Sequence, residues 1–406
     1  MRRSRVLMAG AATAALLFTA ACSTDVPDAP AGGETASEAA EESNESGANS
    51  QWFVQADYDR QLAQRTAVPE GPGEQPWLQA IDPEYVDTAQ YKKEGGKKLC
   101  FSNASVSNPW RVTGFITMQQ QVEVLKASGD ISEFRVSDAA DDDNKQISDI
   151  QAFVEAGDCD AIIISPSTTA TLTPAVEAAC ASGKPVIVFD RGVNSDCMVT
   201  YIHPIGGYAY GADGAEFLVE NLEPGSKVLA LRILPGVDVL ENRWAAADKI
   251  FSESEIEVVG QEFTGGDGAK IKDIVTQYLQ RGDVDGIWMD AGDGAVAAVE
   301  AFEDAGKPYP VFMGEDELSF MRKWKETDMT ALGAVYSNFQ WRTPILAAQK
   351  IWNGEQVPAE WVLPQSPITG EDLDAYLDAN KDMPSLHYAK FGGEDLPGFP
   401  EAWTDR

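Results

Sequence analysis

The sequence is poor in histidine, and it lacks the closely spaced cysteines that bind structural zinc. Only two of its 406 residues are histidine, and none of its five cysteines forms a Cys-x-x-Cys pair. Histidine and paired cysteines supply most zinc ligands, and histidine is the commonest general base beside a nucleophile. We therefore expect no metal site, no cofactor and no catalytic triad that depends on histidine.

Short catalytic fingerprints are also missing. The chain contains no G-x-S-x-G, no G-x-G-x-x-G and no G-x-x-x-x-G-K-[ST] segment. These patterns are typical of serine hydrolases, dinucleotide-binding sites and phosphate-binding loops. The sequence does not argue against an exported enzyme with two catalytic carboxylates, such as a glycosidase, because acidic residues are plentiful. That enzyme stays an alternative to a binding protein.

Positive charge is scarce. Lys and Arg total 31 against 65 Asp and Glu, which gives a formal net charge of -34. Such a surface repels phosphate backbones, so nucleic acid is an improbable partner. The excess of negative charge is also suited to keeping an exported protein soluble.

The N-terminus has the pattern of a secretory signal peptide. Three arginines occur among the first five residues, and residues 6–21 are uncharged and rich in Ala and Leu. This stretch is shorter than the roughly 20 apolar residues that a spanning helix needs. The segment ending at Cys22, Thr-Ala-Ala-Cys, resembles a bacterial lipobox, so Cys22 is expected to carry a lipid anchor. Ordinary cleavage after the small residues is the alternative.

Residues 23–50 contain Ala, Glu, Ser, Gly and Asp with almost no large apolar side chain. Such a segment buries too little surface to fold. We expect it to be a disordered acidic linker that tethers an exported domain to the outer face of the cytoplasmic membrane, or holds it in the periplasm. Residues 51–96 contain scattered aromatics without sustained periodicity, and they form a lead-in segment that packs on the main body.

From residue 97 onward, short apolar runs alternate with amphipathic stretches. Residues 161–164 are apolar on both faces, as in a parallel strand covered by helices. Gly183 and Gly306 each precede Lys-Pro, which ends a helix before the next strand. The fold class is therefore α/β, with two similar lobes that are each a parallel sheet flanked by helices. The expected strands are 98–102, 133–136, 161–165, 185–189 and 199–202, then 227–233, 257–262, 286–290, 310–313 and 330–336.

Polar and aromatic side chains follow these strands. In open α/β sheets, ligands bind outside the carboxyl ends of the strands, so two facing lobes would enclose a cleft. Carboxylates accept hydrogen bonds from sugar hydroxyls, Arg and Asn donate, and an aromatic ring covers the C–H face of a sugar. The segments concerned are 107–111, 189–192, 242–243, 290–293, 314–316 and 336–338.

The order of these segments resembles the periplasmic binding protein type I family, of the ribose-binding and galactose-binding kind. Three segments carry the resemblance: Ser-Asn-Pro-Trp ending at Trp110, Val-Phe-Asp-Arg ending at Arg191 and Gly-Glu-Asp ending at Asp316. It covers about residues 97–365. The resemblance implies a solute-binding protein that captures a small polar ligand, foremost a monosaccharide, and delivers it to an ABC importer. It also implies two lobes joined by a hinge of three chain crossings, and a monomer.

The resemblance also implies a set of ligand residues. Arg111 stands where ribose binders often have a second Phe, so it joins the set as a departure that leaves a negatively charged ligand open. The set is Asn108, Trp110, Arg111, Asp190, Arg191, Arg243, Asp290, Asp293, Asp316 and Tyr336.

Simpler roles stay open for several of these residues. Asp293 and Asp316 stand where they could cap a helix. Asp190 and Arg191 could form an ion pair on a solvated loop. Trp110 is as well suited to a core as to a cleft, and a structural role is the expected one for His203.

Together, the residue patterns and the resemblance give the expected organisation of the whole chain. Two disulfides are expected, Cys180–Cys197 and Cys100–Cys159, the second because the family fold places the two strands concerned side by side. The segments are 1–22, signal peptide; 23–50, linker; 51–96, lead-in; 97–204 with about 335–364, N-terminal lobe; 205–334, C-terminal lobe; and 365–406, C-terminal extension.

Two other functions share this fold. A sensor that reports a bound ligand to a membrane signalling protein would have the same cleft, and the sequence does not separate it from a transport receptor. A repressor of the lac type is excluded, because the signal peptide and the acidic linker stand where a DNA-binding helix pair would be.

Overall fold

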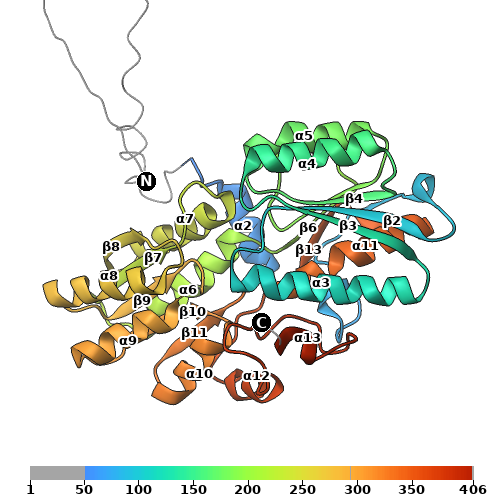
Figure 1. The fold of residues 1–406 in the computed structure, drawn as a ribbon. Helices are drawn as coiled ribbons and strands as arrows, with labels where there is room; N and C mark the ends of the chain where they lie inside the picture. Colours follow the sequence, from blue (N-terminus) through green and yellow to red (C-terminus); the bar gives the residue numbers. More distant parts are fainter. Residues whose placement is uncertain (1–50, 293, 405–406) are drawn as a thin grey trace, which may run out of the picture. The chain divides into compact units, whose positions relative to one another are not determined.

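The computed structural model describes residues 51–292 and 294–404 (Figure 1). The expected signal peptide, the lipid-anchor residue Cys22, the acidic linker and Asp293 lie outside the described residues. No helix within the described part is both long and apolar enough to cross a membrane. The same residues contain no group of three or more His, Cys, Asp or Glu that could hold a metal ion.

The first lobe is built on a six-stranded parallel sheet with the order β3-β2-β4-β5-β6-β13. Every residue of β4 is buried, because helices cover both faces of the sheet. In Figure 1, α4 and α5 lie together on one face, and α3 and α11 lie on the other. The strands are β2 (Lys97–Asn103), β3 (Ile131–Asp138), β4 (Ala161–Ser165), β5 (Val186–Phe189), β6 (Thr200–Pro204) and β13 (Glu360–Leu363). The helices are α3 (Pro109–Ala127), α4 (Asp143–Ala156), α5 (Thr169–Ala181) and α11 (Thr343–Asn353).

The second lobe is built on a five-stranded parallel sheet with the order β8-β7-β9-β10-β11. Because β8 and β9 lie on opposite sides of β7, right-handed crossovers place α7 and α8 on opposite faces. The strands are β7 (Lys227–Arg232), β8 (Glu257–Phe263), β9 (Gly286–Met289), β10 (Val311–Glu315) and β11 (Ala331–Ala334). The helices are α6 (Gly207–Asn221), α7 (Asp238–Ser252), α8 (Gly268–Arg281), α9 (Ala295–Ala305) and α10 (Leu318–Thr327).

The chain passes between the two sheets three times. It leaves the first lobe between β6 and α6, and it returns from β11 through the 3-10 helix η5 (Asn338–Trp341) to α11. It leaves again after β13, and Ile368 then pairs with Gly333 of β11. The fold class predicted from the sequence, two parallel-sheet α/β lobes with flanking helices, is confirmed.

The lead-in segment contains a helix that the sequence did not reveal, α2 (Gln55–Gln64). Its composition is largely polar, so it has no apolar stripe to recognise. Tertiary contacts hold it against α6: the ring of Tyr58 meets that of Tyr208, with centroids 5.9 Å apart, and Arg65 pairs with Asp213 at 2.8 Å. The other short elements before β2 are η3 (Pro76–Leu78), β1 (Tyr85–Val86), which pairs with β12 (Val357–Pro358), and η4 (Ala89–Tyr91).

The C-terminal extension packs on both lobes. Its helix α12 (Leu373–Ala379) contacts α10 of the second lobe, and α13 (Glu401–Thr404) contacts α3 of the first. Between these helices, the N–H groups of Leu318 and Ala389 donate to the carbonyls of His387 and Asp316, at 2.8 and 2.9 Å. The extension is therefore part of the folded body.

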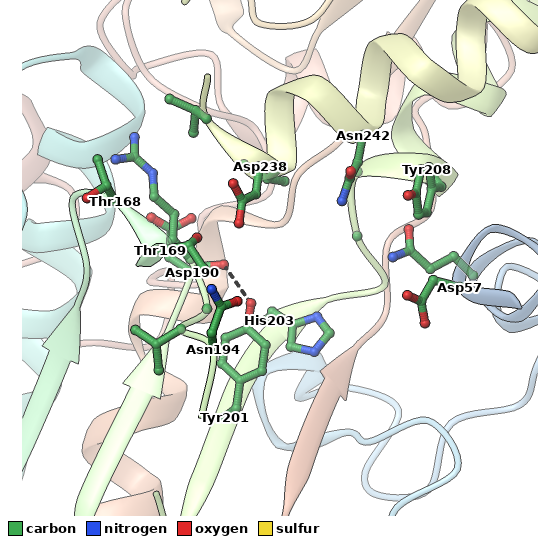
Figure 2. Close-up of a pocket in the computed structure, with 18 of the residues that line it drawn as sticks. Asp57, Thr168, Thr169, Asp190, Asn194, Tyr201, His203, Tyr208, Asp238 and Asn242 are labelled. Carbon is green, nitrogen blue, oxygen red and sulfur yellow. Dashed lines mark hydrogen bonds between the residues drawn. The ribbon is translucent and has the colours of Figure 1, made fainter. Parts of the chain in front are cut away.

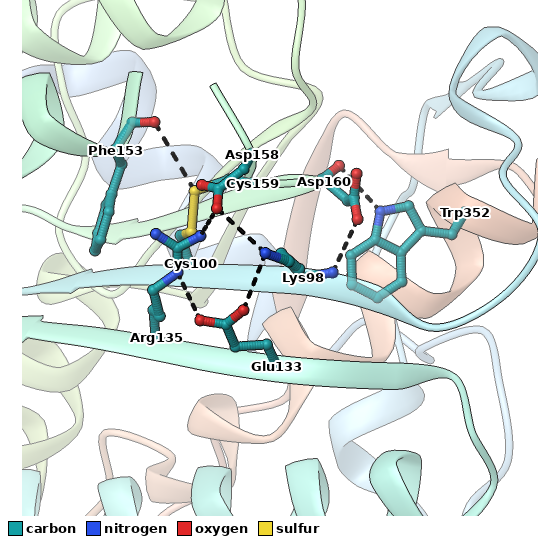
Figure 3. Close-up of a disulfide and its surroundings, with 9 residues drawn as sticks. All are labelled: Lys98, Cys100, Glu133, Arg135, Phe153, Asp158, Cys159, Asp160 and Trp352. Carbon is teal, nitrogen blue, oxygen red and sulfur yellow. Dashed lines mark hydrogen bonds and ion pairs between the residues drawn. A yellow bond between two sulfur atoms is a disulfide. The ribbon is translucent and has the colours of Figure 1, made fainter. Parts of the chain in front are cut away.

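Two disulfides join the strands and helices of the first lobe, in the same pairs that the resemblance implied. Cys100 bonds to Cys159 with a Cα separation of 5.8 Å, and Cys180 bonds to Cys197 with a separation of 6.0 Å. Both separations lie within the usual range of about 4.4–6.8 Å. Figure 3 shows the first disulfide beside a network of ion pairs that links Lys98 to Glu133 and Asp158, at 3.2 and 3.3 Å. This network is a feature of the surface, outside the cleft.

Candidate ligand-binding site

A cavity of about 90 Å³ lies where the carboxyl ends of the two sheets face each other. Most of the ligand residues predicted from the sequence line it, and both lobes contribute to the lining. The residues from the predicted set are Asn108, Trp110, Arg111, Asp190, Arg191, Arg243 and Tyr336. The remaining lining residues are Ile233, Leu234, Val239, Leu240, Ala291, Glu315 and Tyr388.

Asp190 is the fixed anion of this cavity. It follows β5 directly and has a φ of +70°, a left-handed conformation that favours Gly, Asn and Asp. Its Oδ2 lies 2.7 Å from Nη2 of Arg111, and both side chains are 4% exposed. The hydroxyl of Tyr336 donates to the Asp190 carbonyl at 3.1 Å, which holds the strained residue in place. The pairing partner of Asp190 is therefore Arg111, and no ion pair joins Asp190 to Arg191.

Arg111 reaches the cavity because of how α3 begins. The N-cap residue Asn108 accepts a hydrogen bond from the Arg111 backbone N–H at 2.9 Å, and Pro109 occupies the first helical position. Asn108 therefore caps the helix and also lines the cavity.

Arg191 and Arg243 bring two more cations to the cavity. Arg191 donates through Nη1 to the Ser167 carbonyl at 2.6 Å. Burial, and then the neighbouring cation of Arg111, lower the pKa of Arg191 to about 10, so it stays protonated at neutral pH. The guanidinium of Arg243 lies over the ring of Tyr210 at 3.9 Å from its centroid, and over Tyr336 at 4.8 Å. These two cation–π contacts hold the guanidinium of Arg243 at the edge of the second lobe that lines the cavity.

Trp110 serves both the core and the cavity. Its Nε1 donates to the Tyr336 carbonyl at 2.9 Å, and its own carbonyl accepts from Nδ2 of Asn338 at 2.7 Å. Its ring meets Trp341 edge to face, with centroids 5.8 Å apart. The side chain is 8% exposed, so only a small part of the ring is left for a ligand.

The structure adds two residues that the sequence analysis did not select, Glu315 and Tyr388. Glu315 ends β10, and its Oε2 accepts hydrogen bonds from the Gly292 N–H at 2.8 Å and from the Tyr388 hydroxyl at 3.2 Å. Adjacent side chains along a strand point to opposite faces. Glu315 therefore enters the cavity, although the sequence analysis had predicted Asp316 as the ligand residue. Tyr388 comes from the C-terminal extension. The sequence analysis predicted no strand there from which to judge which side chains face the cavity.

Two predicted ligand residues, Asp290 and Asp316, do not line this cavity. Oδ1 of Asp290 accepts from the Ile233 N–H at 2.7 Å, and Oδ2 of Asp316 accepts from the Lys390 N–H at 2.8 Å. Both side chains are buried, and burial raises the pKa of each to about 7. Neither residue lines the cavity of about 90 Å³ or the larger one that adjoins it, and their hydrogen bonds tie loops together. Asp293, which also belongs to the predicted set, lies outside the described residues.

A second cavity of about 260 Å³ adjoins the first, and the two share Asp190, Arg191, Val239 and Tyr336. Figure 2 shows Asp238 and Asn242 of α7 facing Asp190, Asn194 and Tyr201 across this space. Its lining is rich in hydroxyl, amide and carboxyl groups, which are suited to hydrogen-bonding a ligand with many hydroxyls. Its further polar lining residues include Ser167, Thr168, Thr169, Gln61 and Tyr208.

His203 lies at the edge of this second cavity. Its Nε2 lies 3.0 Å from Oε1 of Glu360, and its Nδ1 lies 2.5 Å from the Pro204 carbonyl. Arg60 of α2 also binds Glu360, at 3.0 Å. Glu360 of β13 therefore links His203 of β6 to Arg60 of the lead-in helix.

Two α/β lobes that enclose a polar cavity at facing strand ends are the architecture expected of a solute-binding protein. The chain belongs to the family described as periplasmic binding protein domain, whose model matches residues 99–356. The ribose import binding protein of Bacillus subtilis is 25% identical over 284 residues, covering 69% of this chain and 90% of that protein.

Solved structures share the fold. An ABC transporter solute binding protein from Thermobispora bispora superimposes with a TM-score of 0.65 at 21% identity, over 74% of this chain and 95% of that one. Another, from Bacillus halodurans with bound myo-inositol, gives 0.63 at 21% identity, over 70% of this chain and 98% of that one. These relatives are named as binding proteins and not as enzymes.

Proposed function

We propose that the protein captures a monosaccharide outside the cytoplasm and delivers it to an ABC importer without chemically changing it. The observation that carries this proposal is the buried Arg111–Asp190 pair, set beside Arg191 and Arg243 in one cavity at facing strand ends. Paired carboxylate and guanidinium groups give strong, directional hydrogen bonds to hydroxyl groups. The ribose import binding protein and a solved structure with bound D-allose support a sugar as the ligand class, and one with bound myo-inositol supports a related polyol.

The mechanism is closure of the two lobes about the three connections between them. The lobes comprise residues 97–204 with about 335–364, and residues 205–334. A ligand that contacts Asp190 on one side and Arg243 on the other favours the closed state over the open one. The closed surface is then the form that the permease binds.

The sequence supports an attachment to the membrane. We infer that a signal peptide directs export, that Cys22 carries the lipid, and that residues 23–50 form a flexible tether. The folded body then works as a monomer at the outer face of the cytoplasmic membrane.

A ligand screen tests the function. The protein from Ser23 onward is unfolded and refolded to release bound ligand, and its thermal unfolding is followed with pentoses, hexoses, polyols, acidic sugars, amino acids and nucleosides. A ligand at about 100 times its dissociation constant adds about 2.7 kcal/mol of stability. A rise in melting temperature with one or two related sugars, lost in Asp190→Ala but kept in the exposed control Asp378→Ala, is the expected result.

Two outcomes would contradict the proposal. Turnover of any ligand, followed by chromatography, would show an enzyme. A response restricted to amino acids or nucleosides would remove sugars as the cargo.

A further inference from the structure

Three guanidinium groups line the inner cavity of about 90 Å³, those of Arg111, Arg191 and Arg243. Only two carboxylates line it among the described residues, those of Asp190 and Glu315. The lining therefore has one positive charge in excess, in a chain whose formal net charge is -34. This local excess of cations contrasts with the acidic composition of the chain.

The two carboxylates do not neutralise the cations evenly. Asp190 pairs with Arg111 at 2.7 Å. Glu315 is held instead by the Gly292 N–H and the Tyr388 hydroxyl. Within the described part of the chain, neither Arg191 nor Arg243 has a carboxylate within ion-pair distance. Two guanidiniums thus face the cavity without a paired anion.

The guanidiniums also have unused hydrogen-bonding capacity. Nη1 of Arg111 and Nε of Arg243 are buried, and neither has an acceptor among the residues that the structure describes. The two residues are 3% and 4% exposed, so bulk water does not compensate. Because a buried donor without an acceptor is costly, a ligand that brings acceptors to both groups gains affinity.

We propose that the ligand is an acidic sugar, a uronate or an aldonate, whose carboxylate occupies the inner cavity among Arg111, Arg191 and Arg243. A carboxylate supplies both the missing negative charge and the missing acceptors, in the planar geometry that guanidinium groups bind best. The hydroxyl-bearing part of the ligand extends into the adjoining cavity, toward Asp238 and Asn242 (Figure 2). This inference rests on the proposed function and names the ligand class of the same site.

The direct test uses the unmodified protein and isothermal titration calorimetry. The probes are D-galacturonate, D-glucuronate and D-gluconate, with D-galactose, D-glucose and the methyl esters of the two uronates as neutral counterparts. At least one acid is expected to bind at least about ten-fold more tightly than its neutral counterparts, since hydrogen bonds to charged groups are the stronger ones.

The outcomes separate the two proposals. Equal or tighter binding of a neutral sugar overturns the acidic ligand and leaves a sugar-binding protein. Binding of none of the probes, neutral or acidic, or of the wider sugar panel overturns the proposed function as well.

A substitution localises the effect. Arg243→Gln removes a cation that forms no ion pair within the described part of the chain, although its Nη1 also donates to the Asp290 carbonyl. It is expected to lower the affinity for the acid at least about ten-fold and the affinity for the neutral counterpart by less than about three-fold. The matched control is Arg281→Gln on the exposed surface of α8. An equal loss of affinity for the acid and for the neutral sugar would overturn the proposal that the ligand carboxylate binds beside Arg243.

Discussion

The hydroxyl of Tyr388 lies 3.2 Å from Oε2 of Glu315, and this hydrogen bond joins the C-terminal extension to the last residue of β10. Both residues line the inner cavity. The extension is therefore a part of the candidate site, although it lies beyond the residues that the family model matches.

Tyr388→Phe tests this contact. The substitution removes one donor to a buried carboxylate, so we expect a loss of about 1–3 kcal/mol in the free energy of unfolding. Ligand affinity should fall several-fold, because Glu315 becomes free to reorient. Urea unfolding and calorimetric titration measure the two effects. An unchanged affinity would show that Tyr388 only supports the fold.

Removing one partner of the Arg111–Asp190 pair should lower the free energy of unfolding more than removing both partners. Asp190→Asn leaves the guanidinium of Arg111 buried beside a neutral amide, and loss of one partner of a buried pair costs about 3–5 kcal/mol. The double variant Arg111→Met with Asp190→Asn should recover part of that stability, while ligand binding stays lost. A double-mutant cycle in urea measures the coupling, and additive losses would contradict it.

Arg342 connects the first lobe to the C-terminal extension. It binds both carboxylate oxygens of Asp395, at 2.5 and 2.9 Å, and the Gly392 carbonyl at 3.0 Å, and it lies over the ring of Trp77 at 3.9 Å. Arg342 is 6% exposed, whereas the Asp395 side chain is 54% exposed.

Substitutions of Arg342 and of Asp395 should therefore lower the free energy of unfolding by different amounts. Arg342→Met should lower the free energy of unfolding by about 1–3 kcal/mol, because buried acceptors lose their donor. Asp395→Asn should lower it by less than about 1 kcal/mol, because the carboxylate is largely solvated. Thermal unfolding of both variants is the measurement. Equal losses would mean that the ion pair itself dominates.

Asp316 makes stability depend on pH. Burial raises its folded-state pKa to about 7 from 3.8. The folded protein then holds this proton more tightly than the unfolded chain, so the contribution favours folding below pH 3.8 and is lost as pH rises to about 7. The slope from this group is at most about 1.4 kcal/mol per pH unit.

Asp316→Asn removes the pH-dependent contribution of this carboxyl group to stability and retains an acceptor for the Lys390 N–H. Relative to the unmodified protein, the variant should gain stability as the pH rises from 4 to 7 and then stay level. Urea unfolding at several pH values tests the sign. A parallel pH dependence for the two proteins would show that Asp316 titrates normally.

The two disulfides should contribute unequally. Cys100–Cys159 spans 59 residues and Cys180–Cys197 spans 17. If chain entropy dominates, their removal by paired Cys→Ala substitution costs about 4 and about 3 kcal/mol respectively. Thermal unfolding under oxidising conditions measures the difference. A larger loss from the shorter loop would mean that local packing outweighs chain entropy.

The elements that the sequence predicted well are those whose pattern is local. The apolar run of β4 predicted a strand, because a parallel strand covered by helices on both faces is apolar over a few consecutive residues. The Gly-Lys-Pro segments predicted helix ends, because a left-handed helix end also depends on few residues. The helix α2 was missed because contacts with α6 stabilise it, and its own sequence shows no apolar stripe.

The sequence by itself determined that polar groups such as Asp190 and Arg243 would follow strands of two lobes, because parallel strands bring their carboxyl ends to one edge. Only the tertiary structure decided which of them enter the cavity. A shift of one residue at the end of β10 exchanges Asp316 for Glu315, since adjacent side chains of a strand point to opposite faces. Tyr388 reaches the cavity only because the C-terminal extension folds back on β10, a long-range contact with no local sequence signal.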